Sequence, residues 1–133
     1  MLTTLKQKGY RLTKSRKELF TALSDYPYTV QELAQRLKKQ AVGIDLASIY
    51  RGLAVFLQMG LIYSIDFGDG KKRYELVNKI DHHHHAVCNN CGKIENISFK
   101  QEGKLINDIG KRINYEIENH SIEIFGLCSN CKN

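Results

Sequence analysis

Four cysteines near the end of the chain form two closely spaced pairs of the kind that binds metal ions. They read Cys88-Asn-Asn-Cys91 and Cys128-Ser-Asn-Cys131, and each two-residue spacer lets one tight turn present both sulfurs to one ion. Gly92 permits such a turn directly after Cys91. The alternatives are disulfides or a redox pair, but a chain without a secretory signal is expected to stay in the reducing cytoplasm. We therefore predict a closed structural zinc site of all four cysteines.

A run of four histidines, from His82 to His85, forms the second group of candidate ligands. In an extended strand, His83 and His85 would share one face, and His82 and His84 would share the other. Each pair could form half of a separate metal site. Candidate partners elsewhere in the chain are His120, Glu75, Asp81, Glu95 and Glu102. Mixed nitrogen and oxygen ligands suit Fe2+, Mn2+, Zn2+, Co2+ or Ni2+ without selecting among them. The alternative is a solvated histidine-rich hinge.

Basic residues are concentrated in the first part of the chain. Residues 1–80 hold 14 Lys and Arg against 7 acidic residues, whereas residues 81–133 hold 6 against 7. This asymmetry indicates an anionic partner such as nucleic acid, although a solvated helix face is the alternative. The length of 133 residues suits one domain or two small ones, with the 42% hydrophobic content of a folded globular protein. No apolar run approaches the roughly 18 residues that a membrane span needs.

The elements that must position these residues change type along the chain. Candidate N-caps at Thr13, Thr29 and Asp45 each precede a helical pattern, and Thr29 forms a capping box with Glu32. We expect Gly43 to end the helix that follows Thr29. Residues 61–65 and 72–76 then alternate like the strands of a hairpin around Gly68-Asp69-Gly70. Helices followed by such a hairpin are typical of a winged helix-turn-helix domain.

The second part of the chain predicts a small mixed domain. Strands are expected at 86–88 and 93–97, and a helix capped within 98–101 should place Leu105, Ile106, Ile109 and Ile113 on one side. Two further alternating segments, 115–118 and 122–125, predict additional strands.

The segment Leu46-Ala-Ser-Ile-Tyr-Arg51 has the pattern of a DNA recognition helix. Leu46, Ile49 and Leu53 recur at helical spacing, and Ile49 and Leu53 would hold the core. Ser48, Tyr50 and Arg51 could point into a major groove. The alternative is an ordinary amphipathic helix. Further predicted contacts to phosphates come from the basic stretch around Lys14 and from the tip of the hairpin, at Lys71, Lys72 and Arg73.

Several motifs together give the chain a likeness to a known family. They are Arg11-Leu-Thr-Lys-Ser-Arg16, Ala47-Ser-Ile-Tyr-Arg51, Tyr74-Glu-Leu76, His82-His-His-His-Ala-Val-Cys-Asn-Asn-Cys-Gly92, Asn119-His-Ser121 and Gly126-Leu-Cys-Ser-Asn-Cys131. Through them the chain resembles the ferric uptake regulator family of bacterial metal-dependent repressors over nearly its whole length. The resemblance implies an α+β fold, with a winged-helix DNA-binding domain at 1–76, a hinge at 77–81, and a small α/β metal-binding dimerisation domain at 82–133.

The resemblance also assigns roles to individual residues. Structural zinc would be held by Cys88, Cys91, Cys128 and Cys131. A regulatory metal at the hinge would be held by Glu75, His83, His85 and Asn96. A second metal site would consist of His82, His84, His120 and Glu102. DNA would be contacted by Arg16, Tyr50 and Arg51.

Two departures from the family pattern concern the regulatory site. Many members carry a histidine in the loop before the third helix, and here that loop reads Asp25-Tyr26-Pro27-Tyr28. Asn96 falls where the family has an acidic ligand, which is an aspartate in peroxide-sensing members. An amide oxygen is a weaker ligand than a carboxylate, so Asn96 argues against peroxide sensing.

Together these features predict a metal-responsive repressor, not an enzyme. A homodimer would bind palindromic double-stranded operator DNA in the cytoplasm, carrying structural Zn2+ and a regulatory Fe2+, Zn2+, Mn2+ or Ni2+ ion. Neither a membrane nor a small-molecule substrate is expected as a partner. The alternatives are a DNA-binding protein with structural zinc only and no metal switching, a peroxide-sensing member of the same family, and a zinc hydrolase using the histidine run. The hydrolase lacks an HExxH motif.

Overall fold

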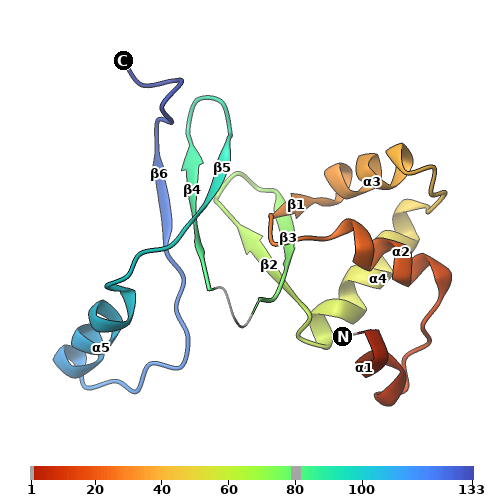
Figure 1. Cartoon of the computed structure of the whole chain (residues 1–133), viewed down its shortest axis with the longest axis horizontal. Helices are drawn as coiled ribbons and strands as arrows, with labels where there is room; N and C mark the ends of the chain where they lie inside the picture. The colour runs from red at the N-terminus through yellow and green to blue at the C-terminus, as the bar shows by residue number, and fades with distance from the viewer. Residues whose placement is uncertain (1, 79–81) are drawn as a thin grey trace. The chain divides into compact units, whose positions relative to one another are not determined.

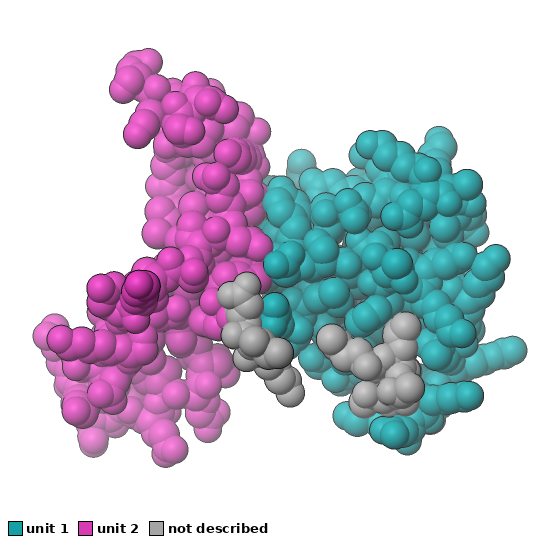
Figure 2. Space-filling view, viewed as in Figure 1, with its two compact units in different colours: residues 1–78 teal, residues 79–133 magenta. Residues whose placement is uncertain are grey.

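The computed structural model describes residues 2–78 and 82–133 and divides into two compact units, Met1–Asn78 and Lys79–Asn133 (Figure 2). The boundary falls within the segment 77–81 that was expected to be a hinge. Asp81, a candidate ligand, and the rest of 79–81 lie outside the described residues. No helix among the described residues is long and apolar enough to cross a membrane.

Unit 1 has the element order of a winged helix-turn-helix domain (Figure 1). Its helices are α1 (Leu2–Gln7), α2 (Lys14–Ala22), α3 (Val30–Lys39) and α4 (Leu46–Gln58). Its strands β1 (Tyr28–Thr29), β2 (Ile62–Asp66) and β3 (Lys72–Leu76) form an antiparallel sheet in the order β1-β3-β2. The hairpin of β2 and β3 is the wing, as the alternating segments predicted.

The core of unit 1 gathers the apolar faces of α2, α3 and α4. Leu19, Leu33 and Phe56 are each 1% exposed or less. The rings of Phe20 and Phe56 meet edge to face with their centroids 5.4 Å apart. A Cβ added at Gly52 of α4 would lie 2.6 Å from Cδ2 of Leu19 on α2, so the absence of a side chain at this position lets the two helices cross closely.

Local signals define where two helices begin. The side chain of Thr13 accepts a hydrogen bond from the N–H of Arg16 at 3.2 Å. Thr29 accepts from the N–H of Glu32 at 3.1 Å, and the Glu32 carboxylate accepts from the N–H of Thr29 at 3.0 Å. The predicted N-cap and capping box are both confirmed.

The end of α3 differs from the prediction. The helix stops at Lys39, and the left-handed residue is Ala41, with a φ of 57°, and not Gly43. The N–H of Val42 donates to the carbonyl of Leu37 at 2.9 Å, and Val42 packs against the core. This closing bond and apolar contact form a Schellman-type end, which offsets the cost of about 1–2 kcal/mol for a left-handed residue with a side chain.

Unit 2 consists of a mixed sheet and one long helix within its described residues. Its elements are β4 (His84–Cys88), β5 (Ile94–Ile97), α5 (Glu102–Ile113) and β6 (Glu123–Gly126). The central β4 pairs antiparallel with β5 and parallel with β6 (Figure 1). Parallel neighbours need a long crossover, which α5 and the loop after it supply.

The crossover confirms one prediction and corrects another. Helix α5 has its N-cap at Gln101, within the predicted segment 98–101, although no side-chain cap forms there. Segment 115–118 is not a strand. The N–H of Tyr115 donates to the carbonyl of Gly110 at 2.8 Å, which turns the chain back along the helix. A Cβ at Gly110 would lie 3.0 Å from the Tyr115 carbonyl and 3.4 Å from Cδ1 of Ile117. The segment therefore packs against α5 at a glycine and does not join the sheet.

Candidate metal centres and nucleic-acid interface

The four cysteines come together at one end of the sheet of unit 2. Cys88 ends β4, Cys91 lies in the turn before β5, and Cys128 and Cys131 lie in the turn after β6. Their sulfurs lie within 4.8 Å of one another. The parallel register places Cys88 opposite Gly126, which brings the two cysteine turns together. All four thiols are free, and the 3.7 Å between Sγ of Cys91 and Sγ of Cys128 far exceeds a disulfide bond of about 2.05 Å.

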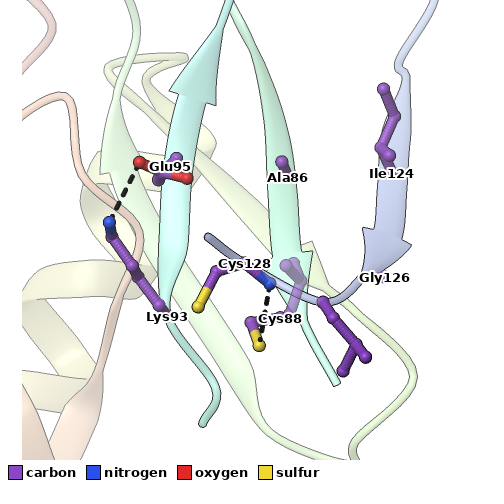
Figure 3. A pocket seen from close by; sticks show the side chains of 9 residues that line it. Ala86, Cys88, Lys93, Glu95, Ile124, Gly126 and Cys128 are labelled. Atoms are coloured by element: carbon purple, nitrogen blue, oxygen red, sulfur yellow. Dashed lines mark hydrogen bonds and ion pairs between the residues drawn. The ribbon is translucent and has the colours of Figure 1, made fainter. Parts of the chain in front are cut away.

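Backbone groups shape each cysteine turn. The N–H of Gly92 donates to the carbonyl of Cys88 at 3.0 Å, and the φ of Gly92 is 76°. The N–H of Cys131 donates to the carbonyl of Cys128 at the same distance, 3.0 Å. The N–H of Cys128 donates to Sγ of Cys88 at 3.4 Å, as Figure 3 shows. The side-chain amide of Asn90 reaches Sγ of Cys131 at 3.3 Å.

The charges of this cluster call for a cation. Backbone N–H groups of Cys91 and Cys128 stabilise the Cys88 thiolate and lower its pKa to about 6. The amide of Lys93 also stabilises the Cys91 thiolate, but the neighbouring sulfurs of Cys88 and Cys128 raise the pKa of Cys91 to about 11. Four thiolates so close together are stable only around a positive ion. The donor set therefore fits Zn2+, which prefers four thiolates in a tetrahedron.

A second cluster joins β4 to the crossover. His84 is 2% exposed on β4, Glu102 is the first residue of α5, and His120 lies in the loop before β6. Nε2 of His82 lies 3.1 Å from Oε1 of Glu102, and Nε2 of His84 and of His120 also contact that oxygen. The contacts with His120 and then His84 lower the pKa of the Glu102 carboxyl to about 2. Three imidazoles and one carboxylate suit a divalent transition metal.

The other face of β4 carries the remaining histidines. The rings of His83 and His85 meet edge to face, with centroids 5.2 Å apart. Asn96 is paired with His85 across β4 and β5, and directly paired residues point to the same face. Glu95 points to the opposite face, where its carboxylate pairs with Lys93 at 3.1 Å. The histidine run therefore alternates as predicted, and Asn96 is on the His83 and His85 side.

The wing of unit 1 carries Glu75 and the predicted phosphate contacts. Glu75 lies in β3 and is 3% exposed, whereas Lys72 at the start of β3 is exposed. Arg73 does not extend towards solvent. Its guanidinium pairs with Asp69 at 2.8 Å, lies over the Phe67 ring, and leaves the side chain 11% exposed. Arg73 thus shapes the wing, and its contact with phosphate stays a prediction.

Helix α4 presents the predicted recognition residues to solvent. Tyr50 is 51% exposed and Arg51 is exposed, while Ile49 is fully buried. Asp45 occupies the N-cap position without forming a side-chain cap, because its carboxylate accepts the hydroxyl of Ser48. Ser48 Oγ in turn accepts a hydrogen bond from Nη2 of Arg51 at 3.1 Å. Leu46, the first residue of α4, is 54% exposed, although it shares the helical spacing of Ile49 and Leu53.

Helix α2 holds the other two predicted DNA contacts. The Lys14 side chain is 88% exposed and lies 3.8 Å from the carboxylate of Glu18. Arg16 is half-buried, and its guanidinium donates to the carbonyl of Arg11.

Two side chains that act on these sites were not predicted. Asp45 restrains Arg51 through Ser48. The sequence signal for this series of contacts was that Ser48 and Arg51 follow Asp45 by three and six residues, which places them along one helix face. Asn90 contacts Cys131, and nothing in the sequence beyond its place in the spacer indicated this.

Comparison with known proteins agrees with this arrangement. Residues 7–125 match the model of the Ferric uptake regulator family. The chain is 35% identical to the ferric uptake regulation protein of Campylobacter jejuni, over 97% of this chain and 84% of that protein. It is 29% identical to the peroxide-responsive repressor PerR of Staphylococcus saprophyticus, over 98% of this chain and 88% of that protein. The crystal structure of the Vibrio cholerae ferric uptake regulator aligns with a TM-score of 0.83 at 29% identity, over 95% of this chain and 98% of that one. The chain therefore belongs to the ferric uptake regulator family of metal-responsive transcriptional repressors.

Proposed function

We propose that this chain acts as a homodimer that binds palindromic double-stranded operator DNA when a divalent metal occupies a site formed by Glu75, His83, His85 and Asn96. The observation that carries the proposal is the division of ligands along β4. One face of the strand presents His83 and His85, the other presents His84 to Glu102 and His120, and the strand ends at Cys88.

The three groups of ligands have separate roles in this proposal. Zn2+ at the four cysteines is structural, because four protein thiolates leave no open position. The four-ligand site around Glu102 ties α5 and the crossover to β4. The face with His83 and His85 responds to metal, because its other ligands come from β5 and, through Glu75, from the wing. Glu75 is suited to this role because it lies near the end of β3 and its carboxylate is an oxygen ligand for divalent metals.

Metal binding would act by a population shift. A metal that joins Glu75 of the wing to the histidines of unit 2 would favour one orientation of the winged helix. DNA binding would then cost less conformational entropy, so the affinity for DNA would rise. Moving from 1% to 99% competent protein needs about 5.5 kcal/mol of differential binding, which a chelate of three or four ligands can supply.

The dimer surface in this proposal is the apolar face of α5. Leu105, Ile109 and Ile113 are between 40% and 48% exposed on one side of this helix. Apolar residues grouped in this way mark an interaction surface. A second copy of the chain would cover this face and fix the distance between the two recognition helices. A dimer with two-fold symmetry matches a palindromic DNA site.

Each α4 would enter a major groove in the operator complex. Ser48, Tyr50 and Arg51 would contact base edges, with Arg16 beside them. The exposed Lys14 and Lys72 would contact phosphates and carry no sequence information themselves. We assign this function to the cytoplasm and assign no catalysis to the chain.

The test is selection of a random DNA duplex library with zinc-loaded protein, with and without added Mn2+ or Fe2+. We expect a palindromic sequence to be enriched only with added metal. The double variant His83→Ala/His85→Ala should lose the metal response, whereas Glu116→Ala, an exposed loop substitution, should retain it. If both variants enrich the same sequence without added metal, the result would favour a DNA-binding protein with structural zinc only and no metal switching. The absence of a histidine in the loop Asp25–Tyr28 supports that alternative.

Peroxide sensing is a second candidate because of the similarity to PerR of S. saprophyticus. Fe2+ is readily oxidised by peroxide, whereas Mn2+ resists it. Loss of operator binding after peroxide treatment in the Fe2+ form alone would support peroxide sensing. Equal binding before and after treatment in both forms would support metal sensing.

A further inference from the structure

His85, on the face of β4 that we propose responds to metal, has a neighbour on each adjoining strand. His85 is paired with Asn96 on β5 and with Glu123 on β6. Paired residues on neighbouring strands point to the same face and lie about 5 Å apart. Asn96, His85 and Glu123 therefore form one row across the sheet. The next row consists of Glu95, Ala86 and Ile124, which are labelled in Figure 3. Because side chains alternate along a strand, this row points to the opposite face.

Among the ligands proposed above, only Glu75 brings negative charge to the metal. His83 and His85 supply neutral imidazoles, and Asn96 supplies at best a neutral amide oxygen. Glu123 has an exposed side chain, and no hydrogen bond or ion pair joins its carboxylate to another described residue. Its flexible side chain can turn towards His85 without disturbing β6. Carboxylate is an oxygen ligand that suits Mn2+.

We propose that Glu123 is a ligand of the regulatory metal and supplies, from β6, the charge that Asn96 does not supply from β5. This inference rests on the proposed function, because it adds one ligand to the metal held by His83 and His85. It also assigns a selectivity. An additional carboxylate favours Mn2+, which prefers oxygen ligands, more than Zn2+, which binds well to imidazole.

The experiment compares Glu123→Gln with Glu118→Gln in full-length, zinc-loaded protein. Both variants carry His120→Ala, so that the second cluster does not obscure the titration. Glu118 is an exposed glutamate in the crossover loop and provides a matched loss of charge. Calorimetric titration gives the affinity for Mn2+ and, separately, for added Zn2+. Retained cysteine-bound zinc and an unchanged melting temperature establish that each variant is folded.

We expect Glu123→Gln to weaken Mn2+ binding at least about 10-fold relative to Glu118→Gln, with a smaller loss for Zn2+. Asn96→Asp should restore Mn2+ affinity in the Glu123→Gln protein, because it returns a carboxylate to the same row. Equal Mn2+ affinity of the two glutamine variants, with binding abolished by His83→Ala, would overturn this inference and leave the proposed function intact. Unchanged Mn2+ binding by His83→Ala as well would overturn both.

Discussion

Removing zinc from the four-cysteine cluster should unfold unit 2 and leave unit 1 folded. The reason is the difference between their interiors. The apolar cluster of unit 1 joins α2, α3, α4 and the wing without any metal. Among the described residues of unit 2, Cys88 and Ile94 are the only buried apolar side chains.

The magnitudes support this expectation. Full burial of an apolar side chain contributes about 1.5–3 kcal/mol, so Cys88 and Ile94 together supply about 3–6 kcal/mol at most. A structural zinc site supplies about 10–16 kcal/mol at pH 7. The apolar face of α5 adds to stability only when unit 2 is already folded and a partner covers it. We therefore expect bound zinc to be the largest single contribution to the stability of unit 2.

Hydrogen exchange measured by mass spectrometry tests this prediction peptide by peptide. After zinc is removed by a chelator, amides of β4 and β6 should lose protection, whereas amides of α2 and α4 should keep it. Cys131→Ser should give the same pattern without a chelator, and excess zinc added with the chelator is the control. Unchanged protection in β4 and β6 at verified zinc loss would refute the reasoning, and so would simultaneous loss in both units.

Three further changes test the fold of unit 1. Phe56→Ala should lower the free energy of unfolding by about 3–5 kcal/mol in urea denaturation, because it opens a cavity in a fully buried site. Thr29→Ala should cost about 1 kcal/mol in the same assay through loss of the capping box, and Thr29→Ser should recover most of it. The hydrogen bonds from Arg73 lower the pKa of Asp69 to about 2, so the stabilisation by this pair should be complete above pH about 4 and lost as the pH falls towards 2. Asp69→Asn should remove this part of the pH dependence, seen as a smaller change in urea midpoint between pH 5 and pH 3.

These outcomes can be contradicted separately. A loss below about 1 kcal/mol for Phe56→Ala would mean that the core around α4 is looser than its burial indicates. A pH dependence that persists in Asp69→Asn would assign the effect to another carboxylate.

Features that depend on neighbours in the sequence could be predicted without the structure. The capping box of Thr29 and Glu32 needs only residues three apart, and each cysteine pair needs only its own turn. The alternation of the histidine run follows from the period of an extended strand. These signals specify local geometry, and the described residues form it as expected.

Features that depend on distant contacts could not be predicted in this way. The alternation of residues 115–118 is the same as that of a strand, but contact with Gly110 holds the segment against α5. The basic run at the tip of the wing gives no sign that Asp69 pairs with Arg73 or that the guanidinium lies over the Phe67 ring. The pairing of His85 with Glu123 depends on a parallel register across the whole crossover, which no local pattern encodes.

The uninterrupted histidine run makes β4 tolerant of slippage. Sliding a strand by one residue sends every side chain to the opposite face, and a strand with only two alternating ligands would then lose its chelating pair. A one-residue deletion between the run and Cys88 would bring His82 and His84 to where His83 and His85 now stand, so two imidazoles would still meet the incoming ion. A one-residue insertion would instead leave a single imidazole there, so the extra histidines protect the chelating pair against a shift in one direction only.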